Sequence, residues 1–156
     1  MDIDQFININ LERDIKILLS HYKHHKVLGQ GDDDILNAVF VGSIVKGRLL
    51  IDMLGIKANS SGGLNFDQEK SGDINAILIG GRLAKHIDLL EGEENMLSDF
   101  LTSVNKAEAH RNGYDQNNDA KIHPSILTVL RLVNTCIYNH SNRQISYNYA
   151  RQLLNK

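Results

Sequence analysis

The apolar positions of residues 34–56 point to every side of a helix, which sets this stretch apart from the rest of the chain. At about 100° per residue, one side and its opposite both carry large apolar groups. The first side holds Leu36, Phe40, Ile44, Ile51 and Leu54, and the second holds Ala38, Val45, Leu49 and Met53. A helix that is apolar all round is normally buried. We therefore expect residues 34–56 to form the central helix of the fold.

Two features refine the interpretation of this stretch. Gly42 and Gly47 would each cost about 1 kcal/mol relative to alanine in a helix, so we expect another helix backbone to approach closely there. Lys46, Arg48 and Asp52 argue against a membrane span, because a charge at the centre of a bilayer costs about 2.5–3.5 kcal/mol. The sequence thus predicts a buried helix of a protein that does not cross a membrane.

Three- and four-residue spacings of apolar side chains predict further helices around the central one. The first covers about residues 4–28, the third 73–92 and the fourth 93–111. A fifth helix is expected to open at Pro124, since proline suits the first helical position. Ser141, with a glutamine three residues later, fits a capping box that opens a sixth helix.

The remaining patterns indicate one domain built from these helices. Residues 57–72 lack periodicity and predict a loop. The chain has 156 residues, of which 42% are hydrophobic and 23% charged, an ordinary globular composition. We therefore predict a single all-α domain over residues 1–156, a bundle of five to six helices around the segment 34–56.

Cysteine usage and the first residues bear on the compartment. Cys136 is the single cysteine, so no intramolecular disulfide forms, and its apolar neighbours LVNTCI favour a packed core thiol. Residues 1–20 place acidic and polar groups between apolar positions, unlike a signal peptide. These observations predict a cytoplasmic protein.

Charge is distributed unevenly along the chain. No acidic residue follows Asp119, whereas five lysines and arginines do, and residues 1–120 carry 12 basic against 19 acidic side chains. Within the basic part, Arg143, Tyr147 and Arg151 share one helical stripe. Arginines that flank an aromatic ring can hold phosphate and stack on bases, so this stripe is a candidate nucleic-acid-binding site. The alternative is ordinary surface packing.

Two further clusters could bind a ligand. Arg48 and Asp52 are four residues apart on the central helix, and they would form either a structural ion pair or an arginine anchored to receive an anion. Lys106, His110 and Arg111 gather where the fourth helix ends, and a histidine beside two cations could hold an anion or transfer a proton. The alternative for this second cluster is a set of cations that stabilises the carboxyl end of the helix.

Metal and cofactor sites are not predicted. His21 and His25 lie one turn apart but have no carboxylate or cysteine near them in sequence. The sequence SSGG at residues 60–63 lacks the lysine that follows the glycines of a phosphate-binding loop. A bundle enzyme with a metal centre would need Glu-x-x-His pairs, which are absent.

The helical layout, together with the NKAEAH sequence that ends the fourth helix, resembles the HEPN-like helical bundles. The catalytic signature of that family is an arginine, four to six residues and a histidine. Here Arg82 and His86 are separated by three residues, and Arg131 and His140 by eight. The resemblance therefore implies a non-nucleolytic member that binds a nucleic acid, a nucleotide or a protein, in bacterial defence or toxin–antitoxin regulation.

From the residues alone, the favoured hypothesis is a non-catalytic binding or regulatory module that contacts a protein partner or forms a homodimer. The alternative is an RNA-binding protein or ribonuclease in which His110 acts with Lys106 and Arg111. RNA cleavage requires a proton acceptor and a cation near the phosphate, and this cluster contains both. A metal or small-ligand enzyme ranks third.

Overall fold

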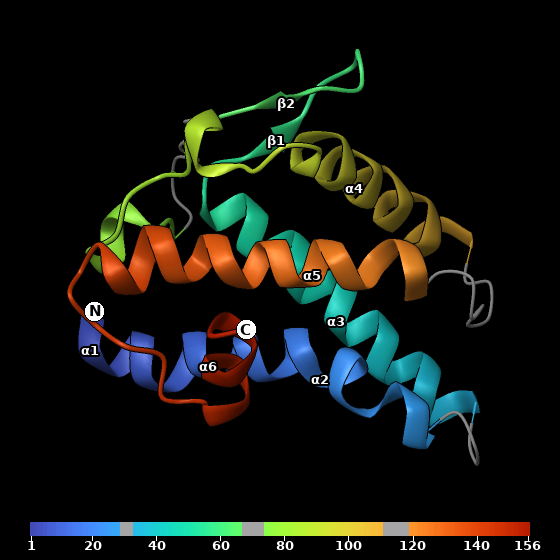
Figure 1. Cartoon of the computed structure of the whole chain (residues 1–156), viewed down its shortest axis with the longest axis horizontal. Helices are drawn as coiled ribbons and strands as arrows, with labels where there is room; N and C mark the ends of the chain where they lie inside the picture. The colour runs from blue at the N-terminus through green and yellow to red at the C-terminus, as the bar shows by residue number, and fades with distance from the viewer. Residues whose placement is uncertain (29–32, 67–73, 111–118) are drawn as a thin grey trace.

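The computed structural model describes residues 1–28, 33–66, 74–110 and 119–156, and gives only the backbone for residues 28, 33, 105–110 and 119–121. These residues form a helical bundle with one short β-hairpin, which confirms the all-α prediction (Figure 1). The first helical rod consists of α1 (Ile3–Gln5), the π-helical segment η1 (Phe6–Leu11) and α2 (Glu12–Leu28). The remaining α-helices are α3 (Asp33–Met53), α4 (Glu93–His110), α5 (Asp119–Val133) and α6 (Asn148–Leu154).

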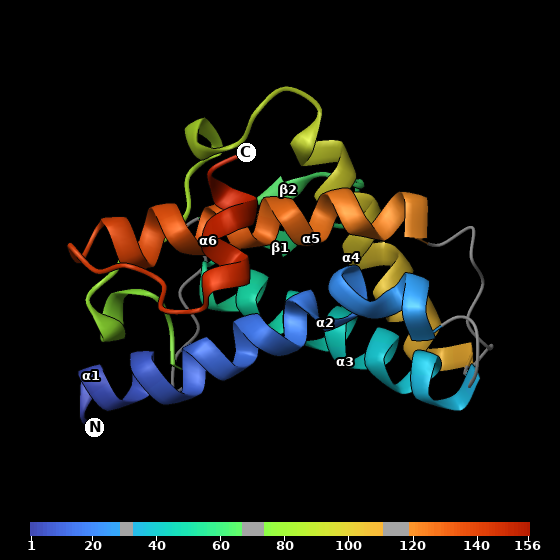
Figure 2. The same ribbon diagram turned by 60° about the horizontal axis from the view of Figure 1, so that its bottom comes forward.

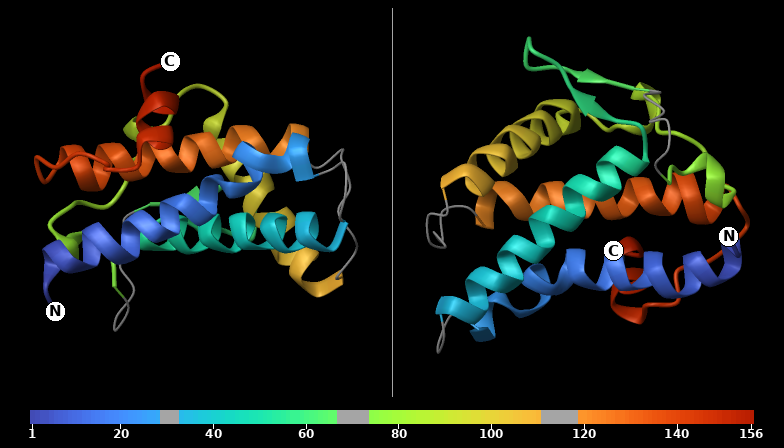
Figure 3. Two further views of the ribbon diagram at one scale, coloured as in Figure 1. Left: turned by 90° about the horizontal axis from the view of Figure 1, so that it is seen from below. Right: turned by 180° about the vertical axis from the view of Figure 1, so that it is seen from behind.

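The helices are stacked in layers. The rod of α1, η1 and α2 lies beside α5, which continues into the π-helical segment η5 (Asn134–Asn139) (Figure 1). The short α6 packs on one side of this pair, as Figure 2 shows. On the other side α3 crosses both helices, with α4 next to it (Figure 3). No helix among the described residues is long and apolar enough to cross a membrane.

The predicted apolar face of the first helix forms part of the core. Ile7, Leu11, Ile15 and Leu18 are all buried, and Asp2 caps the helix by accepting a hydrogen bond from the Gln5 amide at 3.1 Å. This face packs against α3, whose buried side includes Leu36, Phe40, Ile44, Leu50 and Ile51. The core therefore lies between the first rod, α3 and α5.

Burial of α3 is one-sided, whereas the sequence suggested burial on every side. Val41 and Leu49 are 51% and 49% exposed, because α2, α4 and α5 cover only the inner half of the helix. The glycine at position 47 has a different role from the one expected. An added Cβ would lie 2.9 Å from the Phe100 ring, so Gly47 makes room for a side chain of α4 and not for a backbone.

The predicted helix over residues 73–92 is wrong. The described part of this segment, 74–92, contains only two short 3-10 turns, η2 (Ile77–Ile79) and η3 (His86–Asp88). Its amides bond to distant elements: Ala76 to Met53, Arg82 to Cys136 and Ala84 to Leu54.

The helix prediction for residues 74–92 is wrong because a glycine in the left-handed region interrupts the segment. Gly80, with φ of 87°, ends η2 in the left-handed region that glycine favours. The apolar side chains whose spacing suggested one side of a helix are therefore divided between the core and the surface. Ile79 and Leu83 are buried, whereas Ile87 and Leu90 are 86% and 63% exposed.

The predicted starts of the last two helices are also wrong. α5 begins at Asp119, so Pro124 lies inside the helix. Ser141 does not cap a helix, since its hydroxyl donates to the Ile137 carbonyl at 2.7 Å and α6 starts only at Asn148. Part of the predicted 57–72 loop is a hairpin of β1 (Lys57–Ala58) and β2 (Leu64–Asn65), with Lys57 opposite Asn65. Residues 67–72 lie outside the described residues.

Candidate interaction surface

The outer side of α3 carries an apolar stripe, which we call the α3 seam and define as Ile35, Ala38, Gly42, Val45 and Leu49. Ile35 and Leu49 are each 49% exposed, Ala38 is exposed, and Gly42 and Val45 are half-buried. In the rear view of Figure 3, the ribbon of α3 crosses in front of α5 and α2.

The spacing of the seam is that of a helix-pairing surface. Its members are separated by three, four, three and four residues, the alternation found where two helices pack along their length. Single exposed leucines or isoleucines are common on protein surfaces. An ordered apolar stripe on a well-formed helix is not, and such patches mark interaction sites.

One edge of the seam carries a row of residues that begins and ends with a charge. Asp34, Val41 and Arg48 follow one another at intervals of seven residues, so they lie in one row along the helix. Asp52 ends the apolar stripe, one turn after Leu49. On the other edge Lys46 forms an ion pair with Asp14 of α2 at 2.9 Å.

The predicted Arg48–Asp52 ion pair stays a prediction, and Arg48 has a contact within its own chain. Both side chains are half-buried and lie on the outer half of α3. The structure therefore places these two candidates beside the seam and not in an enclosed cleft.

The cluster at the end of the fourth helix falls largely outside the described residues. The backbone of α4 runs to His110, but the side chains of Lys106 and His110 are not described, and neither is Arg111. Their proposed role as an anion or catalytic site stays a prediction.

The predicted stripe of Arg143, Tyr147 and Arg151 is divided in the structure. Arg143 pairs with Asp4 at 2.7 Å, and Arg151 contacts Asn148 at 3.4 Å. Tyr147 lies instead against α2, where it meets lysines that its own helix does not supply.

We call Lys16, Lys23, Tyr147 and Tyr149 the lysine–tyrosine face. Lys23 Nζ lies 5.6 Å from the centre of the Tyr147 ring and 5.1 Å from that of Tyr149, and Lys16 Nζ lies 5.6 Å from Tyr147. These are cation–π distances. Sequence reasoning found Tyr147 but missed the lysines, because more than 120 residues separate Tyr147 from Lys23.

A buried carboxylate holds this face in place. Glu12 accepts hydrogen bonds from the amides of Ser146 at 2.7 Å and Tyr147 at 3.2 Å, and from the Tyr138 hydroxyl at 3.2 Å. Burial, reinforced by the neighbouring Glu12 carboxylate, raises the pKa of Tyr138 far above its ordinary value. Tyr138 therefore remains a neutral donor to Glu12 throughout the physiological range.

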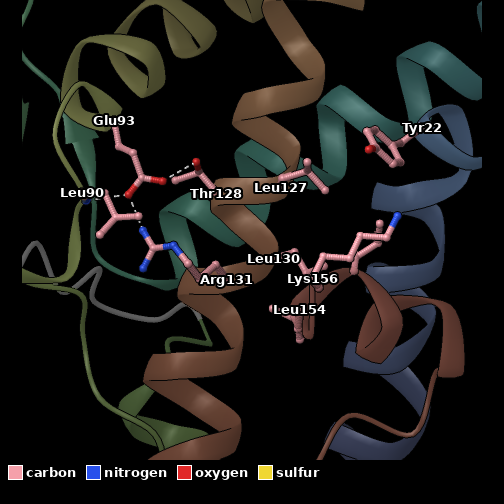
Figure 4. A pocket seen from close by; sticks show the side chains of 10 residues that line it. Tyr22, Leu90, Glu93, Leu127, Thr128, Leu130, Arg131, Leu154 and Lys156 are labelled. Atoms are coloured by element: carbon pink, nitrogen blue, oxygen red, sulfur yellow. Dashed lines mark hydrogen bonds and ion pairs between the residues drawn. The ribbon is translucent and has the colours of Figure 1, made fainter.

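A pocket of about 350 Å³ lies between α5, α6 and the chain before α4 (Figure 4). Its apolar lining includes Leu127, Leu130 and Leu154. On its polar side Glu93 forms an ion pair with Arg131 and accepts from the Thr128 hydroxyl at 2.6 Å. Because Arg131 and Glu93 neutralise each other, this end of the pocket is a structural link between α4 and α5.

Two other groups are of types that can bind a metal or act as a nucleophile: a cluster of three histidines and the buried cysteine. His21 Nδ1 lies 3.0 Å from His123 Nε2, and the His25 ring is centred 4.6 Å from that of His123. Even so, no three metal-ligating side chains of the described residues are arranged to hold an ion. Burial raises the pKa of Cys136 to about 11, so its thiol stays protonated near neutral pH and is a poor nucleophile.

Comparisons with models of known protein families, with curated proteins and with solved structures found no match to this chain.

Proposed function

We propose that this protein is a non-catalytic binding module that associates with a protein partner through the α3 seam. The observation that carries the proposal is the exposure of an apolar stripe with helix-pairing spacing on a helix whose other side is built into the core. Covering the exposed halves of Ile35, Val41 and Leu49 would contribute roughly 1 kcal/mol each. The proposal requires no reactive group.

The resemblance to the HEPN-like bundles is compatible with this role. A member that lacks the arginine–histidine signature would act by binding and not by cutting RNA. A setting in bacterial defence or toxin–antitoxin regulation is part of the same hypothesis.

A charge placed in the seam should abolish the association. We expect Leu49→Lys to lose the partner in quantitative co-purification with tagged protein, because partner binding would bury the lysine ammonium in an apolar interface. Ile9→Lys is the matched control, since Ile9 is 55% exposed on η1, away from α3. Measured at low protein concentration, where self-association does not contribute, both variants should keep the wild-type melting temperature. Equal retention of the partner by both would contradict the proposal.

The lysine–tyrosine face favours a second candidate function, the binding of single-stranded RNA. Two lysine ammonium groups lie over two aromatic rings on one surface, which combines phosphate attraction with stacking. The ribonuclease hypothesis built on His110, Lys106 and Arg111 is separate and stays a prediction.

RNA binding by this face should depend steeply on salt. We expect Lys16→Gln with Lys23→Gln to weaken the binding of a single-stranded RNA and to flatten its salt dependence, by about 0.7 in logarithmic slope for each phosphate that the variant no longer neutralises. Fluorescence anisotropy over a salt series measures both quantities. Lys57→Gln, on the hairpin, is the control. Absence of wild-type binding at low salt would rule out this candidate.

A further inference from the structure

We propose that the α3 seam is occupied by α3 of a second copy of this chain, arranged antiparallel about a twofold axis that passes near Val41. This inference rests on the proposed function, because it names the partner of the same surface. Three observations support it: the placement of charges beside the seam, the distribution of small and large residues along it, and the neutralisation of its other edge.

The charge placement is self-complementary. In an antiparallel pair, a residue that precedes Val41 lies opposite the partner residue that follows Val41 by the same number. Asp34 precedes Val41 by seven residues and Arg48 follows it by seven, each about 10.5 Å along the helix. Equivalent edges of two antiparallel helices meet, so the twofold axis places Asp34 opposite the partner's Arg48 and repeats that pair at the other end.

The same charges do not support a parallel arrangement. In a parallel pair this edge would meet the partner's opposite edge, so Asp34 would not lie opposite the partner's Arg48 and the favourable charge pairing would be lost. Asp34 and Arg48 each have a contact within their own chain as well. The pairing between copies therefore adds to an existing arrangement, and its main effect is on orientation.

The sizes of the seam residues suit this crossing. Ala38 and Gly42 lie within three residues of Val41, so the two helices can approach closely near the axis. Ile35 and Leu49 lie toward the ends, where the antiparallel arrangement brings Ile35 near the partner's Leu49. Small residues at the centre and large ones at the ends fill the space between two helices that cross.

The second edge of the seam adds no repulsion. Lys46 is bound to Asp14 of its own chain at 2.9 Å, so two copies of this edge would not present bare ammonium groups to each other. Such compensation matters because like charges that meet at an interface oppose association.

Charge-reversal variants test the arrangement directly. We expect the wild type to dimerise in sedimentation velocity, and both Asp34→Arg and Arg48→Asp to weaken the dimer by at least about tenfold. Each variant alone would face two like-charge contacts. An equimolar mixture of the two variants should dimerise again, since every contact in the mixed dimer joins opposite charges. A variant that merely failed to fold could not be rescued by mixing.

The outcomes separate this inference from the proposed function. If the wild type stays monomeric up to about 1 mM, or if mixing restores nothing, the self-pairing is wrong. In that case loss of a different protein by Leu49→Lys would still support the seam as a binding surface. If Leu49→Lys changes neither self-association nor co-purification, both proposals fail.

Discussion

Replacement of Glu12 by alanine should destabilise the fold by about 3 kcal/mol or more, the largest effect we expect from removing a single side chain. The carboxylate is only 5% exposed and accepts from the Ser146 amide, the Tyr147 amide and the Tyr138 hydroxyl. An unsatisfied buried donor costs about 1–3 kcal/mol, and hydrogen bonds to a charged acceptor are the stronger ones. Alanine would leave all three donors without this acceptor.

Chemical denaturation of three variants measures how much the Glu12 carboxylate contributes to the free energy of unfolding. Glu12→Gln keeps one acceptor oxygen and should lose less than Glu12→Ala. Tyr138→Phe removes a single hydrogen bond and should lose about 1 kcal/mol. A free energy of unfolding within about 1 kcal/mol of wild type for Glu12→Ala would show that this carboxylate does not hold the chain before α6.

Loss of Glu12 should also affect the lysine–tyrosine face. The two amides that Glu12 binds belong to the extended segment that precedes α6, and this segment fixes the position of Tyr147 against α2. If that face binds RNA, a folded Glu12 variant should bind it more weakly than wild type. Stability and RNA binding are thus linked through one carboxylate.

The spacing of apolar residues was sufficient to predict the helices that pack a long apolar side against the core. The predicted helices 4–28, 34–56 and 93–111 match the rod from Ile3 to Leu28, α3 and α4 closely, because each presents a long run of apolar residues to the core. These runs satisfy helical hydrogen bonding and burial together, so no distant residue is needed to specify them.

Distant contacts explain the failures. The Ser141 capping pattern is locally valid, but Glu12 binds the amides of residues 146 and 147 from the far end of the chain and keeps this segment extended. Residues 74–92 show apolar spacing that resembles a helix, yet their amides pair with Met53, Leu54 and Cys136. Neither pairing can be deduced from neighbouring residues.

The candidate surfaces likewise depend partly on neighbouring residues and partly on distant contacts. Periodicity correctly marked α3 as apolar on opposite sides, but it could not tell which side packs against α2, α4 and α5 and which remains open. The sequence gives the seam its residues, whereas the arrangement of the other helices makes it accessible. The lysine–tyrosine face depends even more on the fold, since α2 supplies its cations and the region of α6 its rings.

Gly81→Ala should destabilise the protein by about 2–4 kcal/mol through steric overlap. An added Cβ would lie 2.6 Å from the Cys136 carbonyl oxygen, 3.0 Å from the Ile137 Cα and 3.1 Å from the Ala76 carbonyl oxygen. All three atoms belong to the backbone, so no flexible side chain can move away.

The sign of the Gly81→Ala effect is more informative than its size. If residues 73–92 formed the helix suggested by their spacing, alanine would stabilise this position by about 1 kcal/mol. Gly42→Ala supplies the comparison, because Gly42 lies in α3 and its nearest neighbour is the Ile17 side chain at 3.4 Å. Thermal unfolding at low protein concentration should therefore show Gly42→Ala equal to or above wild type and Gly81→Ala well below it. A stabilised Gly81→Ala would be incompatible with the packing of residues 74–92 against η5.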